Sequence, residues 1–305
     1  MRRSYRQAFR VKTFLLALFV LLSTNAGCCQ LVEDHPLPGS GGVAIRAWTY
    51  RSGALLVKGE LFTPSGVGKC SAVIFCHDGI SGISREHRMA SIRLARAGFV
   101  VFAPSYRGED GSQGMVEIAK GEVDDVLAAL PLLEKLERVD SHRIAVAGAS
   151  HGALIGVLAA SRSKELKAAV LAYGVMDIYR WWEYLKDAHK LGNDRITDRT
   201  YGYGPQARPE SFQMRNALAV VTKVDCPVLL LQGEKDDIVP PQQAREMKRA
   251  MDAAGKICEL KIYPSCLHGF LVYAPYLHHG VEPAERRETE SAWKEMIAFL
   301  QRTLK

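Results

Sequence analysis

Residues 143–160 read RIAVAGASHGALIGVLAA, and this stretch decides the fold that the rest of the chain must fit. Its first five residues predict a buried strand, and residues 153–160 predict a helix packed closely on that strand. Between them lies Gly148-Ala149-Ser150-His151-Gly152, a serine at a strand-to-helix turn. The glycines leave room for a sharp turn that lifts the hydroxyl out of the sheet, so Ser150 is a candidate nucleophile. A G-x-S-x-G pattern alone also fits a small-residue packing turn, and other residues must decide between the two.

The N-terminal segment, residues 1–27, has the layout of an export signal. Five basic side chains occupy its first 12 residues, an apolar run follows over Phe14–Leu22, and small and polar residues close it. That run is too short to span a bilayer comfortably, so we expect cleavage after Ala26 or Gly27 and a periplasmic or extracellular protein. Two alternatives stay open: acylation of Cys28, which would anchor the protein by a lipid, and an uncleaved N-terminal anchor.

Removing this segment changes the charge balance. Five of the 40 Lys and Arg residues and none of the 33 Asp and Glu residues precede Cys28, so the remainder carries a net charge of +2. The high isoelectric point therefore comes from the leader, and we expect no nucleic-acid partner and no membrane contact beyond the leader or a lipid on Cys28. The 278 remaining residues suffice for one large α/β domain, whose oligomeric state stays open.

Five cysteines follow Cys28 and Cys29, and their spacing matches no zinc pattern. Because an exported protein can hold disulfides, and because Cys226 and Cys258 both precede strands expected to be neighbours, these two are the pair we favour for a disulfide. Cys76 lies within an apolar strand and is expected to be a buried small hydrophobe. We expect no metal and no organic cofactor.

Strands and helices alternate along most of the chain. Residues 28–42 are expected to be a tether, and residues 43–48 and 54–63 an opening antiparallel hairpin. Short apolar strands then alternate with amphipathic helices, which predicts a mostly parallel sheet with helices on both faces over residues 43–305. Residues 175–224 break the alternation and predict a small aromatic cap above the carboxyl edge of the sheet, where ligands bind in such folds.

An acid and a base follow later strands in the order that a serine nucleophile needs. Asp236 follows the strand at residues 228–232 and can orient an imidazole, whereas the adjacent Asp237 is suited to cap the next helix. Both aspartates could instead be turn and cap residues. His268 lies in the loop after the last strand, where Gly269 allows a tight turn that presents the ring.

The loop after the strand at residues 71–76 predicts the oxyanion donors. It contains His77-Asp78-Gly79, a glycine turn with free backbone N–H groups. We assign one donor to the N–H of His151, directly after the nucleophile, and one to the N–H of Gly79. His77 is expected to brace this loop by hydrogen bonding, not to act as a base.

Together these motifs resemble the α/β-hydrolase fold, within its prolyl-oligopeptidase-like and dienelactone-hydrolase-like branch. The resemblance covers residues 43–304 and rests on five motifs: His77-Asp78-Gly79, Tyr106-Arg107-Gly108, Val139 to Ile144, Gly233 to Pro240, and His268-Gly269-Phe270. It implies a stand-alone catalytic domain. Prolyl-oligopeptidase-like peptidases carry an N-terminal propeller, for which this chain has no room, and dienelactone hydrolases proper use a cysteine where Ser150 stands.

The expected activity is hydrolysis of an ester or amide bond in a small-molecule ester or short peptide, through an acyl-enzyme on Ser150. His268 is the expected base and Asp236 its partner. Esterase and peptidase need the same triad, so the sequence leaves that choice open. An acyltransferase, or a non-catalytic exported binding protein on the same fold, is the alternative. Arg180, Arg195 and Arg199 of the cap could bind a carboxylate or simply be solvated.

Overall fold

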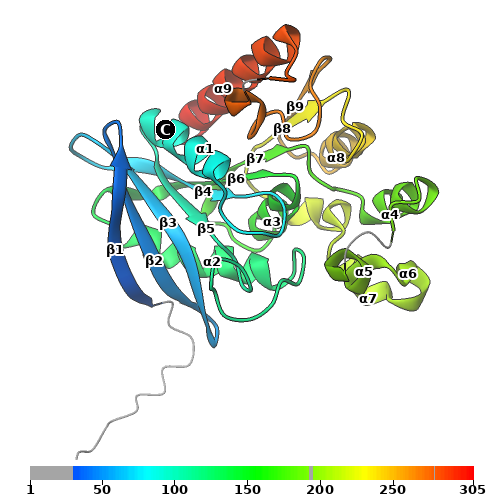
Figure 1. Cartoon of the computed structure of the whole chain (residues 1–305), viewed down its shortest axis with the longest axis horizontal. Helices are drawn as coiled ribbons and strands as arrows, with labels where there is room; N and C mark the ends of the chain where they lie inside the picture. Colours follow the sequence, from blue (N-terminus) through cyan, green and yellow to red (C-terminus); the bar gives the residue numbers. More distant parts are fainter. Residues whose placement is uncertain (1–29, 192–194, 278) are drawn as a thin grey trace, which may run out of the picture.

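Nine strands form one sheet in the described part of the chain, in the order β1-β2-β3-β5-β4-β6-β7-β8-β9 (Figure 1). The computed structural model describes residues 30–191, 195–277 and 279–305. The expected export signal and the lipid site at Cys28 lie outside these residues. Within them, no helix is both long enough and apolar enough to cross a membrane.

The sheet changes from antiparallel to parallel along its width. Strands β1, β2, β3 and β5 pair antiparallel, and β5, β4, β6, β7, β8 and β9 pair parallel. Strands β4 and β5 and the second half of β6 are continuous apolar runs because both of their faces are covered. The strands are β1 (Leu31–Ser40), β2 (Val43–Ser52), β3 (Leu55–Pro64), β4 (Cys70–Cys76), β5 (Val100–Pro104), β6 (Val139–Ala149), β7 (Leu166–Ala172), β8 (Val228–Gly233) and β9 (Cys258–Tyr263).

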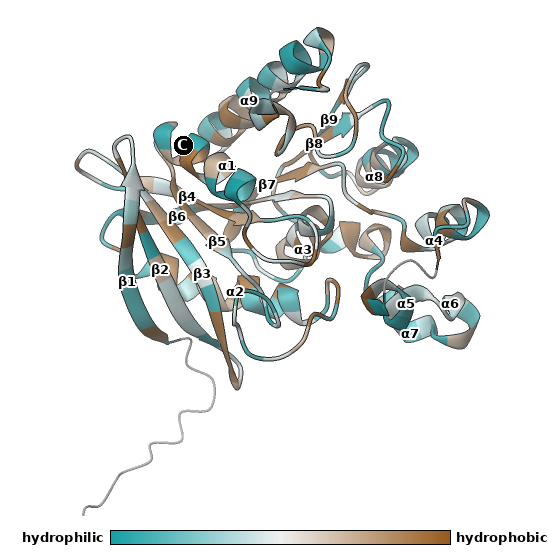
Figure 2. Ribbon diagram, viewed as in Figure 1, coloured by the Kyte–Doolittle hydropathy of each residue, from teal (hydrophilic) through white to brown (hydrophobic). Residues whose placement is uncertain are grey.

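Helices cover both faces of this sheet, which confirms the predicted fold class. On one face, α2 (Gly121–Glu134), α3 (His151–Ala160) and α8 (Gln242–Ala253) pack on the sheet. On the other lie α1 (Arg85–Arg96) and α9 (Pro283–Thr303). Figure 2 shows hydrophobic residues concentrated in the central strands and hydrophilic ones on much of the outer helices.

An insertion between β7 and β8 replaces the usual single helix, as the broken alternation predicted. Its described residues form four α-helices and the 3₁₀ helix η1: α4 (Ile178–Asp187), α5 (Arg195–Tyr201), α6 (Gly204–Ala207), α7 (Pro209–Gln213) and η1 (Ala217–Lys223). Tyr201 and Phe212 are buried in a small separate core with Val116, Ile118 and Val239. These aromatic side chains therefore fasten the insertion to the domain. A further 3₁₀ helix, η2 (Ala274–Tyr276), follows β9.

The prediction of a tether at residues 28–42 is wrong from residue 30 onward, where the structure describes the chain. Leu31–Ser40 forms the edge strand β1, which pairs with β2. Leu31 and Leu37 pack against the two sides of the core, which gives this segment a reason to pair. Pro36 and Pro38 are tolerated because an edge strand needs only half of its N–H groups.

The expected Cys226–Cys258 disulfide is also wrong, since both thiols are free. Cys258 lies in register with Val228, so Cys226 falls two residues short of it. Burial raises the pKa of Cys226 to about 11 and that of Cys258 to about 12. Both thiols are therefore protonated at neutral pH, as expected of small core residues.

Candidate active site

Ser150 occupies the sharp turn between β6 and α3. Its backbone has φ 50° and ψ −117°, a strained conformation for a residue with a side chain. A Cβ on Gly148 would lie 2.2 Å from the carbonyl oxygen of Gly152, and a Cβ on Gly152 would lie 2.1 Å from that of Cys76. Both glycines are therefore required for β6, α3 and β4 to approach closely enough to form this turn.

Ser150, His268 and Asp236 form one hydrogen-bonded chain. Nε2 of His268 lies 3.0 Å from Oγ of Ser150, and Nδ1 lies 2.8 Å from Oδ2 of Asp236. Because a carboxylate only accepts, Nδ1 of His268 carries the hydrogen and Nε2 is free to accept the serine proton. The structure thus brings together the three residues that the sequence placed at separate strand ends.

The carboxylate of Asp236 is held by donors on every side. Oδ1 accepts from the N–H groups of Ile238 (3.0 Å) and Val239 (2.8 Å), and Oδ2 accepts from Nε2 of Gln232 (3.2 Å) as well as from His268. Its neighbour Asp237 instead presents its carbonyl oxygen to the insertion. The geometry therefore favours Asp236 over Asp237 as the partner of the imidazole.

The two residues expected to supply the oxyanion donors, Gly79 and His151, are joined by a hydrogen bond. Among the described residues, the N–H groups of Gly79 and His151 donate to no other group, so both are free to bind a ligand. Nδ1 of His151 lies 2.9 Å from the carbonyl oxygen of Gly79 and donates to it. Burial lowers the pKa of His151, which keeps its ring neutral at pH 7. The side chain of the residue after the serine thus steadies the loop opposite.

His77 braces that loop from beneath, as the sequence predicted. Its ring is fully buried; Nδ1 donates to the carbonyl of Asp78 at 2.9 Å, and Nε2 lies 3.1 Å from Glu109. Tyr106 packs against the same ring, with 4.3 Å between ring centroids. These contacts occupy His77 and leave His268 as the imidazole beside Ser150.

Comparison with known protein families assigns this chain to one of them. The sequence profile of the Dienelactone hydrolase family matches residues 57–304. The chain belongs to this family. Its homologues are hydrolases, and this dienelactone hydrolase family member is a serine hydrolase with the α/β-hydrolase fold.

Relatives of this family member include proteins named as peptidases and as putative carboxymethylenebutenolidases. An uncharacterized peptidase of Bacillus subtilis, YtmA, is 31% identical over 244 residues, 79% of this chain and 93% of the relative. A putative carboxymethylenebutenolidase of Escherichia coli strain K12 is 24% identical over 233 residues, 72% and 73% of the two chains.

Solved structures share the fold at lower identity. Pyrococcus horikoshii acylaminoacyl peptidase superposes with a TM-score of 0.71 at 19% identity, over 87% of this chain but only 42% of the peptidase. A putative dienelactone hydrolase of Klebsiella pneumoniae superposes with a TM-score of 0.60 at 18% identity, over 89% and 99% of the two chains.

Two residues beside the triad were not predicted from the sequence. Tyr173 directly follows the carboxyl end of β7, and the centroid of its ring lies 4.9 Å from that of the His268 ring. Tyr173 has φ 40° and is buried, so it forms a rigid wall for the imidazole. Tyr273 reaches from the turn after His268 to Asp78. Tyr173 could have been predicted as a site residue, because it directly follows a parallel strand. The sequence offered no comparable signal for Tyr273.

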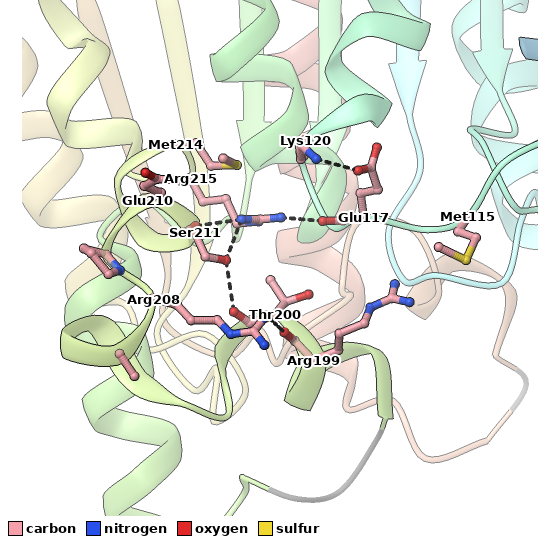
Figure 3. Close-up of a pocket in the computed structure, with 12 residues that line it drawn as sticks. Met115, Glu117, Lys120, Arg199, Thr200, Arg208, Glu210, Ser211, Met214 and Arg215 are labelled. Atoms are coloured by element: carbon pink, nitrogen blue, oxygen red, sulfur yellow. Dashed lines mark hydrogen bonds and ion pairs between the residues drawn. The ribbon is translucent and has the colours of Figure 1, made fainter. Parts of the chain in front are cut away.

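A separate hollow of about 640 Å³ lies between the insertion and residues 115–120 (Figure 3). Arg199, one of the candidate carboxylate ligands, lines it and donates to the carbonyl of Val116 at 2.6 Å. Arg215 is buried there, and its guanidinium donates hydrogen bonds to the backbone carbonyls of Glu117, Ile118 and Ser211. None of the triad residues lines this hollow, so these arginines first serve to hold the insertion in place.

Arg180, another candidate ligand, and the adjacent tryptophans also make structural contacts. Arg180 lies 3.2 Å from Glu246. Trp181 packs edge-on against Tyr201, and Trp182 packs edge-on against Phe212. Within the described residues, no three His, Cys, Asp or Glu side chains are grouped so as to hold a metal ion.

Proposed function

We propose that this protein is an exported serine hydrolase that cleaves an ester or amide bond through an acyl-enzyme on Ser150. The hydrogen-bonded chain from Ser150 through His268 to Asp236 carries the proposal. A serine hydroxyl is a weak nucleophile on its own, and it becomes effective when an oriented base accepts its proton. The strained turn at Ser150 supports the same assignment, because it points the hydroxyl away from the sheet.

In the first half-reaction, Oγ of Ser150 attacks the substrate carbonyl carbon while Nε2 of His268 takes the hydroxyl proton. The carbonyl oxygen becomes an oxyanion, and the N–H groups of His151 and Gly79 stabilise it. The intermediate collapses with loss of the alcohol or amine, which takes the proton from His268. Asp236 keeps the imidazole in the correct tautomer and stabilises its charged form.

In the second half-reaction, water replaces the leaving group. Nε2 of His268 removes a proton from water as its oxygen attacks the acyl carbon of the ester on Ser150. The same two N–H groups stabilise the second oxyanion. Collapse returns the proton to Oγ of Ser150 and releases the carboxylic acid. Besides the substrate and water, these steps use only the side chains and backbone donors described above.

The substrate is a small ester or a short peptide. The matched relatives are named as peptidases and as a putative carboxymethylenebutenolidase, and these names span amide and ester substrates. Exposed Ile238 follows Asp236 by two residues and exposed Leu267 directly precedes His268, which supports an apolar group beside the scissile bond. Hydrolysis of p-nitrophenyl esters and of aminoacyl p-nitroanilides, measured side by side, would separate the two activities.

Export rests on the N-terminal sequence, with its basic head, short apolar run and small residues before Cys28. Fractionation of cells that express the full chain, followed by mass spectrometry of the N-terminus, tests it. A mature chain that begins at residue 27 or 28 supports cleavage, and an added acyl mass on Cys28 supports the lipid anchor. An intact N-terminus in the cytosolic fraction contradicts export.

The role of Ser150 is tested by labelling the purified protein with a fluorophosphonate probe. We expect a single adduct on Ser150, identified by peptide mass spectrometry, and loss of labelling in Ser150→Ala and His268→Ala. The control is Ser161→Ala at the other end of α3, which should label like the wild type. Undiminished ester hydrolysis in Ser150→Ala would contradict the proposed mechanism.

A further inference from the structure

The carboxylate of Asp78 is a buried charge that the proposed mechanism does not use. Asp78 directly precedes Gly79, and the residue is 6% exposed. Its Oδ1 lies 2.8 Å from Nε2 of His87 on α1 and 2.5 Å from the hydroxyl of Tyr273, which follows the catalytic histidine loop. One oxygen therefore joins three segments that are remote in the sequence.

His87 connects this carboxylate to the start of α1. Nδ1 of His87 accepts the N–H of Ser84 at 2.9 Å, so its hydrogen sits on Nε2 and points at Asp78. The hydroxyl of Ser84 in turn accepts N–H groups of the first helical turn. We call residues 77–84, between β4 and α1, the oxyanion loop. The imidazole of His87 thus fixes both the end of this loop and the start of α1.

Tyr273 connects the carboxylate to the loop that carries His268. The N–H of Tyr273 donates to the carbonyl of Gly269 at 2.9 Å, which closes a tight turn directly after the histidine. Gly269 has φ +77°, and a Cβ there would lie 2.8 Å from the ring of Tyr273. The ring therefore rests on the glycine beside His268, and the hydroxyl extends from it to the oxyanion loop.

The charges in this contact are well defined. Burial opposes ionisation of Asp78, but the hydrogen bonds from His87 and Tyr273 outweigh it, so the pKa of Asp78 lies below its usual value. Burial and the nearby Asp78 raise the pKa of Tyr273. At neutral pH the contact is therefore a neutral hydroxyl donating to a carboxylate, which is a strong type of hydrogen bond.

We propose that Asp78 and Tyr273 are positioning residues that hold the oxyanion loop in register with the loop of His268. The inference rests on the proposed function, in which Gly79 donates to the oxyanion. Such a donor must lie within about 3 Å of the developing charge, and a displacement of about 1 Å costs as much as 100-fold in rate. Because Asp78 and Gly79 are adjacent, loss of the Tyr273 hydrogen bond removes this link between the donor and the loop of His268, and His87 alone then holds the carboxylate.

The test compares Tyr273→Phe with Tyr276→Phe, three residues further on, whose hydroxyl makes no hydrogen bond with the described residues. With a p-nitrophenyl ester, we expect Tyr273→Phe to lower kcat about 10-fold at unchanged KM, whereas Tyr276→Phe matches the wild type. Affinity for phenylboronic acid, which forms a tetrahedral adduct with serine, should fall by the same factor as kcat/KM. Asp78→Asn should show the same pattern with a larger loss.

A structural role alone would lower Tm and leave the kinetics of the folded fraction unchanged. The proposal is overturned if Tyr273→Phe keeps wild-type kcat, if only KM rises, or if boronate affinity is unaffected while kcat falls. Fluorophosphonate labelling of the wild type is scored separately. Absence of that labelling contradicts the proposed function itself, whereas a labelled wild type with an unimpaired Tyr273→Phe contradicts only the positioning role.

Discussion

Oδ2 of Asp236 lies 2.8 Å from Nδ1 of His268, whereas the adjacent Asp237 presents its carbonyl oxygen to Tyr184 and Lys190 of the insertion. Two neighbouring residues therefore serve two different parts of the molecule. One orients the imidazole, and the other fastens helix α4 above the same loop. The peptide unit between Asp237 and Ile238 couples the insertion to the acid of the triad. Its carbonyl accepts from Tyr184 and Lys190, and its N–H donates to Oδ1 of Asp236.

This division of labour predicts unequal effects of two matched substitutions. Asp236→Asn removes the charge that stabilises the imidazolium and favours the wrong tautomer, so we expect kcat for a p-nitrophenyl ester to fall about 10³–10⁴-fold. Asp237→Asn keeps the carbonyl that α4 uses and should change kcat less than about threefold. Steady-state kinetics of both variants decide the matter, and the reverse order would assign the acid to Asp237.

The sharp turn at Ser150, which we call the elbow, predicts a difference in stability between two glycine substitutions in α3. In Gly152→Ala the new Cβ meets the backbone carbonyl of Cys76, which has no room to yield. We expect a loss of about 3 kcal/mol in the free energy of unfolding, measured in urea, together with loss of fluorophosphonate labelling.

Gly156→Ala on the same helix is the control. There a Cβ would lie 3.3 Å from Leu171 and 3.4 Å from Val146, both of them side-chain contacts. The helix gains about 1 kcal/mol from alanine, and the tight contacts offset part of that gain. Equal stability losses in the two variants would show that the elbow is not the constrained position.

Local pattern was sufficient to predict the elbow and the order of the triad. Gly148 and Gly152 flank Ser150 within five residues, and parallel strands bring their carboxyl ends to one edge, so Asp236 and His268 could be placed from strand order alone. The edge strand β1 was missed because Pro36 and Pro38 resemble a linker, and only the pairing with β2 shows that Leu31 is covered.

Contacts between remote side chains could not be predicted in this way. Asp78 and Tyr273 are separated by 195 positions, and neither lies in a pattern that names the other. The same holds for the buried aromatic residues of the insertion. Its composition predicted an aromatic cap at the carboxyl edge of the sheet, but not that Tyr201 and Phe212 turn inward and fill a core. A single sequence shows which residues are apolar but not which of them face each other.

The Tyr106-Arg107-Gly108 motif predicts a third measurable effect. Arg107 donates to Asp125, whose carboxylate is fully buried, at 2.7 Å. Arg107→Gln leaves that carboxylate without its counter-charge, and we expect a loss of about 3 kcal/mol in the free energy of unfolding. The control is Arg162→Gln, whose ion pair with Asp124 is half exposed and should cost less than about 0.5 kcal/mol. Similar urea midpoints for the two variants would contradict a structural role of Arg107.

The imidazole of His151 predicts a pH dependence of stability. Burial lowers its pKa in the folded protein, whereas an unfolded chain restores a value of about 6.5. Between those two values the unfolded state binds a proton that the folded state rejects, so stability is full above about pH 6.5 and is lost as the pH falls through the folded pKa. His151→Gln keeps an amide donor for Gly79 but cannot titrate. We therefore expect its Tm to fall less than that of the wild type between pH 7 and pH 5, whereas His142→Gln, at an exposed position, should follow the wild type. Parallel curves for His151→Gln and the wild type would mean that this imidazole does not titrate differently on folding.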